Sequence, residues 1–172
     1  MIRPCTDADL PTIRAIINEA AHAYYNVIPP DCWHEPYMSE DELASEIAAG
    51  VDFWGWDDAR ALVGVMGIQK VHDATLIRHA YVRPAYQHRG IGAALLKALL
   101  GQTSGHVLVG TWAAAEWAIR FYRRHGFRLV PIQQKNQLLK QYWKISPRQQ
   151  ETSVVLALPS SSATSSNLST QH

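Results

Sequence analysis

The amino-acid sequence predicts a single α/β (α+β) domain in which helices flank a mixed, mostly antiparallel central sheet. The chain has 172 residues, 47% of them hydrophobic, which suits one domain with a sizeable core. Short apolar stretches joined by turns fill residues 51–82 and are typical of a strand meander. Beyond them, helical and strand patterns alternate. A meander followed by such alternation favours a mixed sheet covered by helices.

The first 50 residues are expected to contain a short strand at residues 2–4 and two helices. Thr6 and Asp9 match a capping box, in which side chains satisfy the free amides at the start of a helix. Apolar residues then recur at helical spacing, namely Leu10, Ile13, Ile16, Ile17, Ala20 and Tyr24. Ser39 and Glu42 form a second capping box, which predicts a short helix.

The rest of the chain continues this pattern. The meander strands are expected at residues 51–56, 61–70 and 75–82, and a helix begins at residue 91. The later elements are a strand at 107–111, a helix that carries Tyr122, a strand near 127–130, a short helix around 137–143 and a last strand at 153–158. Residues 159–172 are rich in Ser and Thr, and we expect a disordered tail outside a domain of residues 1–158.

Composition excludes several classes of protein. Sixteen basic and fifteen acidic residues give a net charge of +1, so no general field favours nucleic acid or an anionic membrane. The two cysteines are too few for a disulfide framework, which suits a reducing compartment. No long apolar segment predicts a signal peptide or a membrane span. We therefore expect a cytoplasmic protein.

A glycine-rich turn stands between the strand at 75–82 and the next helix. Pro84 has no amide hydrogen for a strand ladder, and apolar residues resume at helical spacing from Ile91. Between them, Gln87-His-Arg-Gly-Ile-Gly92 contains two residues without side chains, so the backbone can approach a ligand closely. The start of a helix also carries partial positive charge. The turn predicts an anion site, and the alternative is that Gly90 and Gly92 only shape a tight connection.

Two motifs resemble the GNAT N-acetyltransferase superfamily. Gln-x-x-Gly-x-Gly at residues 87–92, after Val-x-Pro, is similar to its acetyl-coenzyme A loop. Residues 118–127, Ala-Ile-Arg-Phe-Tyr-Arg-Arg-His-Gly-Phe, resemble its A-x-x-F-Y-x-x-x-G-F signature. The resemblance implies a sheet that splays between its fourth and fifth strands. It also implies an enzyme that transfers the acetyl group of acetyl-coenzyme A to a primary amine without a metal.

The resemblance places the cofactor on two adjacent segments. Main-chain groups of Ala80, Tyr81 and Val82 are expected to pair with the pantetheine arm, and an amide near Tyr81 is expected to stabilise the oxyanion. The pyrophosphate is expected on the glycine turn, whose cofactor-binding residues are Gln87, His88, Arg89, Gly90, Ile91, Gly92 and Ala93.

Tyr122 and His79 are the expected catalytic residues. The resemblance gives Tyr122 the role of the acid that protonates the departing coenzyme A thiolate, and the alternative is an ordinary core tyrosine. His79 lies on the strand expected to border the acetyl group, and an imidazole titrates near neutral pH, so it is the expected base. The alternative is a neutral histidine packed between strand and helix.

The acceptor is expected to meet an aromatic region of the chain. The resemblance places acceptor recognition before the meander, where one loop carries Trp33, His34, Glu35 and Tyr37, and Trp54 follows on the first meander strand. Aromatic walls suit a cationic amine or a flat apolar substrate, whereas core packing explains scattered aromatic residues equally well. His34 and Glu35 are alternative bases that would act through a water.

Two positions depart from relatives that acetylate protein amino termini. Their fifth-strand glutamate is Gly110 here, and the asparagine that many relatives carry seven residues before the tyrosine is Ala115. The sequence therefore favours a small-molecule amine. The alternatives are a protein lysine or amino-terminal acetyltransferase and a non-catalytic acyl-coenzyme A sensor, and homodimer formation is left open.

Overall fold

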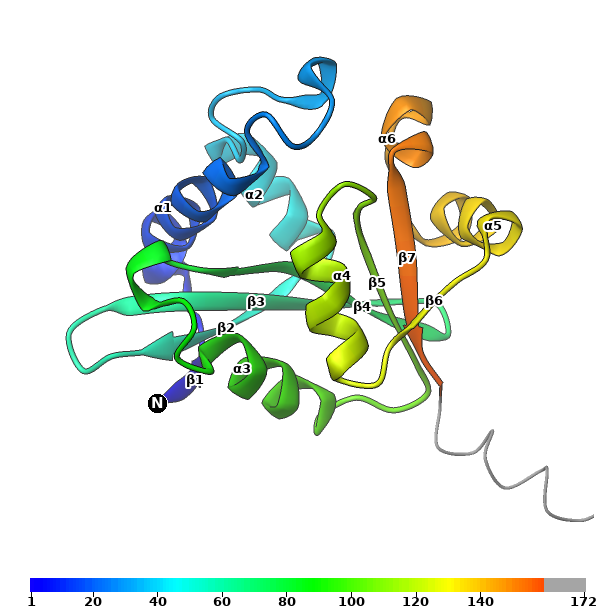
Figure 1. The fold of residues 1–172 in the computed structure, drawn as a ribbon. Coiled ribbons are helices and arrows are strands. Elements are labelled where there is room, and N and C mark those ends of the chain that lie inside the picture. Colours follow the sequence, from blue (N-terminus) through cyan, green and yellow to red (C-terminus); the bar gives the residue numbers. More distant parts are fainter. Residues whose placement is uncertain (160–172) are drawn as a thin grey trace, which may run out of the picture. The chain divides into compact units, whose positions relative to one another are not determined.

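The computed structural model describes residues 1–159, so the predicted disordered tail, apart from Pro159, lies outside the described residues. The chain forms two compact units. The amino-terminal unit comprises residues 1–70 and 77–102, and the carboxy-terminal unit comprises residues 71–76 and those from 103 onward. Figure 1 labels the helices and strands of each unit.

The amino-terminal unit is built on an antiparallel meander. Its strands are β1 (Ile2–Pro4), β2 (Asp52–Asp57), β3 (Leu62–Val71, except its last residue) and residues 77–82 of β4 (Ala74–Val82). Ile2 of β1 lies opposite Trp56 of β2, and Asp52 of β2 lies opposite Ile68 of β3. The helices of this unit are α1 (Leu10–Ala21), α2 (Glu40–Ala48) and α3 (Ile91–Leu100).

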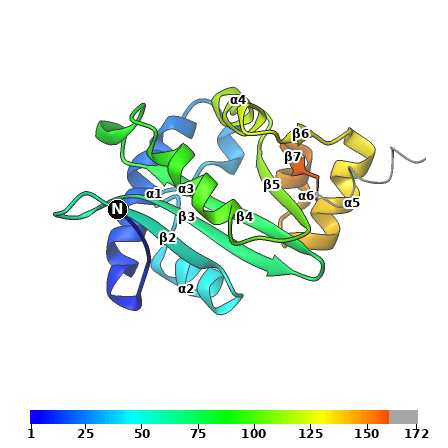
Figure 2. The ribbon, with the colours of Figure 1, turned by 90° about the horizontal axis from the view of Figure 1, so that it is seen from below.

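Helices cover both faces of this meander, with α2 on one side and α3 on the other (Figure 2). The core under α1 and α2 consists of Ile13, Ile16, Ile17, Met38, Leu43, Val51, Phe53, Leu62 and Val65. On the α3 side, a Cβ added to Gly64 would come within 3.0 Å of Ile91. Successive strand side chains point to opposite faces, so Phe53 enters the α1/α2 core and Trp54 points to the α3 face.

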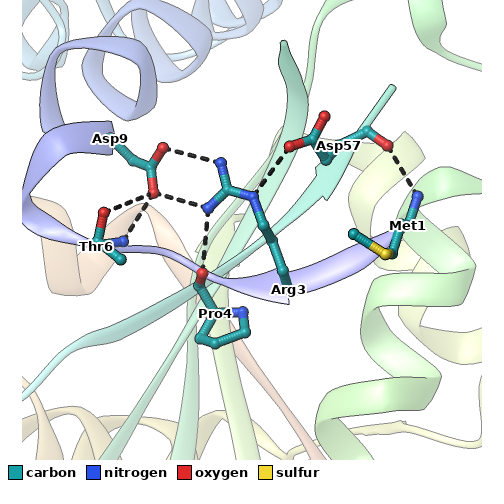
Figure 3. Close-up of polar contacts among 6 residues, drawn as sticks. All are labelled: Met1, Arg3, Pro4, Thr6, Asp9 and Asp57. Atoms are coloured by element: carbon teal, nitrogen blue, oxygen red, sulfur yellow. Dashed lines mark hydrogen bonds and ion pairs between the residues drawn. The ribbon is translucent and has the colours of Figure 1, made fainter. Parts of the chain in front are cut away.

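A charged network fixes the first residues of the chain to β2 (Figure 3). Arg3 binds both carboxylate oxygens of Asp9, from Nη1 at 2.9 Å and from Nη2 at 3.0 Å. Its Nε donates to Oδ2 of Asp57 at 3.0 Å, and the terminal amine of Met1 donates to the Asp57 carbonyl at 2.8 Å. The hydrogen bonds that Asp9 accepts from Arg3 and from the amide of Thr6 lower the pKa of Asp9 to about 2.

The carboxy-terminal unit is built around two long strands, β5 (His106–Trp112) and β7 (Ser153–Leu158). β7 pairs antiparallel with β5 and with the short β6 (Arg128–Leu129). Residues 74–76 of β4 also belong to this unit. Its helices are α4 (Glu116–Arg124), α5 (Ile132–Tyr142) and α6 (Pro147–Glu151). Leu139 of α5 packs into a core that contains Ala74, Leu76, Leu108 and Val155.

The strand order along the chain's sheet is β1-β2-β3-β4-β5-β7-β6. The register is antiparallel for β1 with β2, β2 with β3, and β7 with both of its neighbours, and β4 with β5 is a parallel pair. The predicted α/β fold with a mixed, mostly antiparallel sheet is therefore confirmed. The splay between the fourth and fifth strands stays a prediction.

Element boundaries differ from the predicted ones mainly after residue 125. The helix expected around 137–143 begins at Ile132, because its polar first turn hides its start from an apolar pattern. Helix α6 was not predicted from the sequence, although Ser146 caps it by accepting a hydrogen bond from the Gln149 amide at 3.2 Å. Near the amino terminus, Thr6 precedes a 3₁₀ turn at Asp7–Asp9, and α1 follows it. Within residues 1–159, no helix has the length and apolarity to cross a membrane.

Candidate active site

The glycine turn places a set of backbone amides at the start of α3. Gly90 precedes the helix in the left-handed conformation, with φ of +80°, and His88 has φ of +63°. Gln87 braces the turn, because its Nε2 donates to the Val82 carbonyl at 3.0 Å. Across the part of the chain that the structure describes, no group accepts a hydrogen bond from the backbone amides of residues 88–93. These amides are available to an anion, as the sequence predicts.

The space beside Gly90 is open. A Cβ added at this position would have no described heavy atom within 4 Å beyond its chain neighbours. Glycine is needed there for the backbone, since an L-residue is strained at this φ. The exposed Arg89 lies beside the turn, with Cζ 5.1 Å from the centre of the Tyr86 ring. Close backbone access and a neighbouring cation are what a phosphate requires.

Tyr81 connects the end of β4 to the loop after α1. Its ring meets Tyr24 edge-on at 6.3 Å between centroids, and Tyr24 lies 5.6 Å from Tyr37. Burial raises the pKa of Tyr81 well above its ordinary value, and the phenols of Tyr24 and Tyr37 raise it further. Tyr81 therefore stays neutral at physiological pH. The neighbouring Ala80 and Val82 are half-buried, like Tyr81 itself.

The rings of this loop form one continuous set with Tyr81, which we call the aromatic group: His22, Tyr24, Tyr25, Trp33, His34, Tyr37 and Tyr81. Trp33 is central, since its ring lies 5.5 Å from Tyr25 and stacks on Tyr37 at 5.7 Å. His34 stacks on the same Tyr37 at 6.1 Å. Tyr25 is 56% exposed, so the group reaches the surface. Three of the predicted acceptor residues are thus brought together.

Glu35 and Trp54 differ from these three residues in their placement. Glu35 is exposed in the same loop, next to His34, whose Nδ1 lies 2.9 Å from the Pro36 carbonyl. Trp54 points to the opposite face of the sheet, because it alternates with the core residue Phe53. Its indole Nε1 is buried and has no hydrogen-bond partner among residues 1–159. The structure does not bring Trp54 to the aromatic group.

His79 adopts an unusual backbone conformation inside β4. Its φ is +54°, in the left-handed region that non-glycine residues seldom occupy. The imidazole stacks on Phe53 at 6.0 Å, and its Nε2 lies 3.2 Å from Oε2 of Glu46 on α2. His79 therefore packs between strand and helix, but against a carboxylate as well as an apolar ring.

Tyr122 lies in the carboxy-terminal unit, near the end of α4. Its side chain is buried, and its ring lies 5.1 Å from Phe121 and 5.4 Å from Phe127. Gly126 follows the helix with φ of +90° and turns the chain so that Phe127 reaches the Tyr122 ring. The ring is part of the core, and the acidic role of its hydroxyl stays a prediction.

Residues 49–129 match the family model described as acetyltransferase (GNAT) domain. These residues form a GNAT acetyltransferase domain. The matched range contains both motifs that the sequence analysis singled out, the glycine turn and residues 118–127. For residues 49–129, the predicted family is confirmed.

Known proteins extend the match beyond the GNAT domain. The chain is 24% identical over 148 residues to the peptidyl-lysine N-acetyltransferase YiaC of Escherichia coli (strain K12), which covers 85% of this chain and 95% of YiaC. The PaiA N-acetyltransferase of Thermoplasma acidophilum, solved with coenzyme A, has a TM-score of 0.68 at 18% identity over 92% of this chain and 98% of its own. The ribosomal-protein-S18-alanine N-acetyltransferase of Escherichia coli has a TM-score of 0.66 at 21% identity over 92% of each chain.

Together these findings confirm the prediction of an acetyl-coenzyme A-dependent N-acetyltransferase. They do not distinguish a small-molecule acceptor from a protein lysine. Within residues 1–159, no group of three or more His, Cys, Asp or Glu side chains is arranged to hold a metal ion.

The structure gives a physical reason for glycine at position 110 of the GNAT domain. A Cβ at Gly110 on β5 would lie 3.3 Å from Cζ2 and 3.4 Å from Cε2 of Trp143. These contacts are tight for a single methyl group, so a glutamate side chain would require the indole to move. Ala115, the second departure, is fully buried.

Glu46, the carboxylate beside His79, was not predicted from the sequence. A signal was present in α2, where Glu46 lies between the core residue Leu43 and the partly buried Ile47. An acidic residue on the apolar side of an amphipathic helix indicates a buried partner. The place of Tyr24 at helical spacing in the first helix gave no indication of its contact with Tyr81.

Proposed function

We propose that this N-acetyltransferase acts on the primary amine of a small molecule, by direct attack on acetyl-coenzyme A in a ternary complex. The observation that carries the proposal is the aromatic group, which links the expected acceptor loop to Tyr81 on β4. Ring faces attract cations and stack on flat molecules, so they suit a compact ammonium or an arylamine. The acceptor contacts in this proposal are Trp33, His34, Glu35 and Tyr37, and Trp54 is left out because it points to the other face.

The cofactor would lie along β4 and the glycine turn. Main-chain groups of Ala80, Tyr81 and Val82 would hold the pantetheine arm, and the free amides of residues 88–93 would hold the pyrophosphate. Gln87 and Arg89 support this role, the first by bracing the turn and the second by its charge.

Transfer requires a neutral amine, a positioned thioester and an acid for sulfur. In the proposed reaction His79 takes a proton from the acceptor, whose nitrogen forms a bond to the acetyl carbon. The carbon–sulfur bond then breaks, and Tyr122 donates its proton to the thiolate. The motif around Tyr122 supports its role as the acid, and the position of His79 on β4 supports its role as the base.

A peptide lysine is the second candidate acceptor, since the relative YiaC is a peptidyl-lysine N-acetyltransferase. A protein amino terminus is less well supported, because Trp143 covers Gly110 where a glutamate would stand. The test is thiol release from acetyl-coenzyme A across amino acids, polyamines, aminoglycosides, arylamines and lysine peptides, with calorimetric binding of coenzyme A in parallel. Turnover confined to small amines supports the proposal, and turnover confined to peptides overturns it. Binding without any turnover would indicate an acyl-coenzyme A sensor.

Two variants of this enzyme test the proposed roles of Trp33 and Tyr122. Trp33→Ala should raise KM for the acceptor about tenfold and leave KM for acetyl-coenzyme A unchanged. Tyr122→Phe should lower kcat at least about a hundredfold with little change in coenzyme A affinity, since only the proton donor is removed. Unchanged kcat in Tyr122→Phe would remove this residue from the mechanism.

A further inference from the structure

Glu46 of α2 lies at the centre of a polar cluster in the amino-terminal unit. Its Oε2 lies 2.8 Å from Nη2 of Arg78 and 3.2 Å from Nε2 of His79. Arg78 in turn donates from Nη1 to Oε1 of Gln69 at 2.8 Å, and Gln69 donates to the carbonyl of Ala49 at 2.9 Å. The cluster thus runs from α2 through β3 and β4 back to the end of α2, which fixes the carboxylate in place.

The environment keeps Glu46 ionised. Its side chain is 26% exposed, and burial on its own would raise its pKa. The interaction with His79 and the charge of Arg78 outweigh burial, so the pKa lies below its ordinary value. Glu46 contacts His79 directly, Arg78 contacts the same carboxylate, and the ring of Phe53 stacks on the imidazole.

The two ring nitrogens of His79 have different surroundings. Nε2 is buried beside Glu46, without the alignment of a hydrogen bond to any group in residues 1–159. Nδ1 is not among the buried unpaired atoms of this part of the chain, and the His79 side chain as a whole is 16% exposed. The strained backbone, with φ of +54°, and the stack on Phe53 hold the ring in this orientation.

We propose that Glu46 is a positioning residue for His79, which keeps a proton on Nε2 and leaves the lone pair of Nδ1 to accept a proton from the acceptor amine. The inference rests on the proposed role of His79 as base. A histidine tautomer is set by the partner of its other nitrogen, and a carboxylate selects the protonated form of the nearer one. Hydrogen bonds of this kind commonly align only when substrate binds.

The proton balance of the step is simple. The acceptor N–H bond breaks as the Nδ1–H bond forms, and the nitrogen's electron pair forms the new bond to the acetyl carbon. The resulting imidazolium carries a proton on each nitrogen, and the Glu46 carboxylate faces the charge on the Nε2 side. The proton on Nδ1 then passes to solvent. Without the carboxylate, the imidazolium is less stable and the base is weaker.

Glu46→Gln tests the inference, because it keeps the shape of the side chain and removes its charge. Glu42→Gln is the matched control, since Glu42 is exposed on the same helix. We expect kcat/KM of Glu46→Gln to fall at least about tenfold at pH 7, and the acidic limb of its pH profile to move to lower pH. The control should match the wild-type enzyme. A lower Tm with an unshifted pH profile would show that Glu46 only ties α2 to the sheet, and would overturn the inference.

His79→Asn separates this failure from failure of the proposed function. If His79→Asn loses activity while Glu46→Gln keeps the wild-type pH profile, the role of His79 as base is supported and the role of Glu46 is refuted. If His79→Asn is fully active, both are refuted. Should Glu46→Gln not fold, nitrogen NMR of the wild-type enzyme gives the tautomer directly. A neutral His79 protonated on Nε2 supports the inference, and one protonated on Nδ1 overturns it.

Discussion

Gly90→Ala separates two reasons for glycine in the turn before α3. Gly90 has φ of +80°, and a Cβ there meets no described heavy atom within 4 Å beyond its chain neighbours. The cost to the folded protein is therefore backbone strain alone, about 1–2 kcal/mol for an L-residue in the left-handed region. A second cost arises only if a phosphate occupies the open space, because the methyl group would displace it from the free amides.

The expected loss of coenzyme A affinity follows from one such amide. A hydrogen bond to a charged group contributes about 1.5–3 kcal/mol. Since about 1.4 kcal/mol corresponds to a tenfold change, Gly90→Ala should weaken coenzyme A binding about 10- to 100-fold.

Gly50→Ala provides the control for this experiment. Gly50 follows α2 with φ of +100°, and its Cβ also meets nothing within 4 Å, so the strain is comparable. Thermal unfolding should show a similar loss of stability in the two variants, and calorimetry with coenzyme A should show weaker binding in Gly90→Ala only. Equal affinity in both variants would refute the assignment of the turn to the pyrophosphate.

Three further experiments test the packing and the charges of the structure. Asp9→Asn should lower the free energy of unfolding at neutral pH by about 1 kcal/mol after solvent screening. The pKa of Asp9 is about 2 in the folded chain against 3.8 without partners. In urea titrations, the extra stability of the wild type should therefore be present above about pH 4 and disappear toward pH 2. A stability difference that stays constant with pH would contradict this prediction. Gly110→Glu should destabilise the protein by about 1–3 kcal/mol in thermal unfolding, and the same change should cost less in a Trp143→Ala background; an equal cost in both backgrounds would exclude the indole as the obstacle. Cys5, whose pKa burial raises to about 11, should react with a thiol reagent far more slowly in the folded than in the unfolded chain by mass spectrometry, and equal rates would show that the thiol is accessible.

The glycine turn was predictable from the sequence because its determinants are local. A strand that ends at Val82, two glycines and the first apolar residue of α3 all lie within a few positions of one another. Gly126 was predictable for the same reason, since the end of a helix selects glycine in the next position. The weakly patterned α5 and the short α6 were predicted poorly, because packing on β7 rather than apolar periodicity supports them.

The residues near the acceptor were harder to predict, because their arrangement depends on contacts between residues far apart in the chain. The sequence placed Trp33 and Trp54 in one hypothesis, but strand alternation points Trp54 to the α3 face. The sequence indicated no partner for His79, and the structure places Glu46 of α2 beside it.

The acetyltransferase motifs, the acetyl-coenzyme A donor and the local shape of the cofactor turn were predictable from the sequence, because short motifs and glycine conformations depend on neighbouring residues. The pairs that meet across the fold, Glu46 with His79 and Tyr24 with Tyr81, became known from the three-dimensional structure. These pairs depend on how α1 and α2 pack on the meander, and no spacing along the chain records that packing.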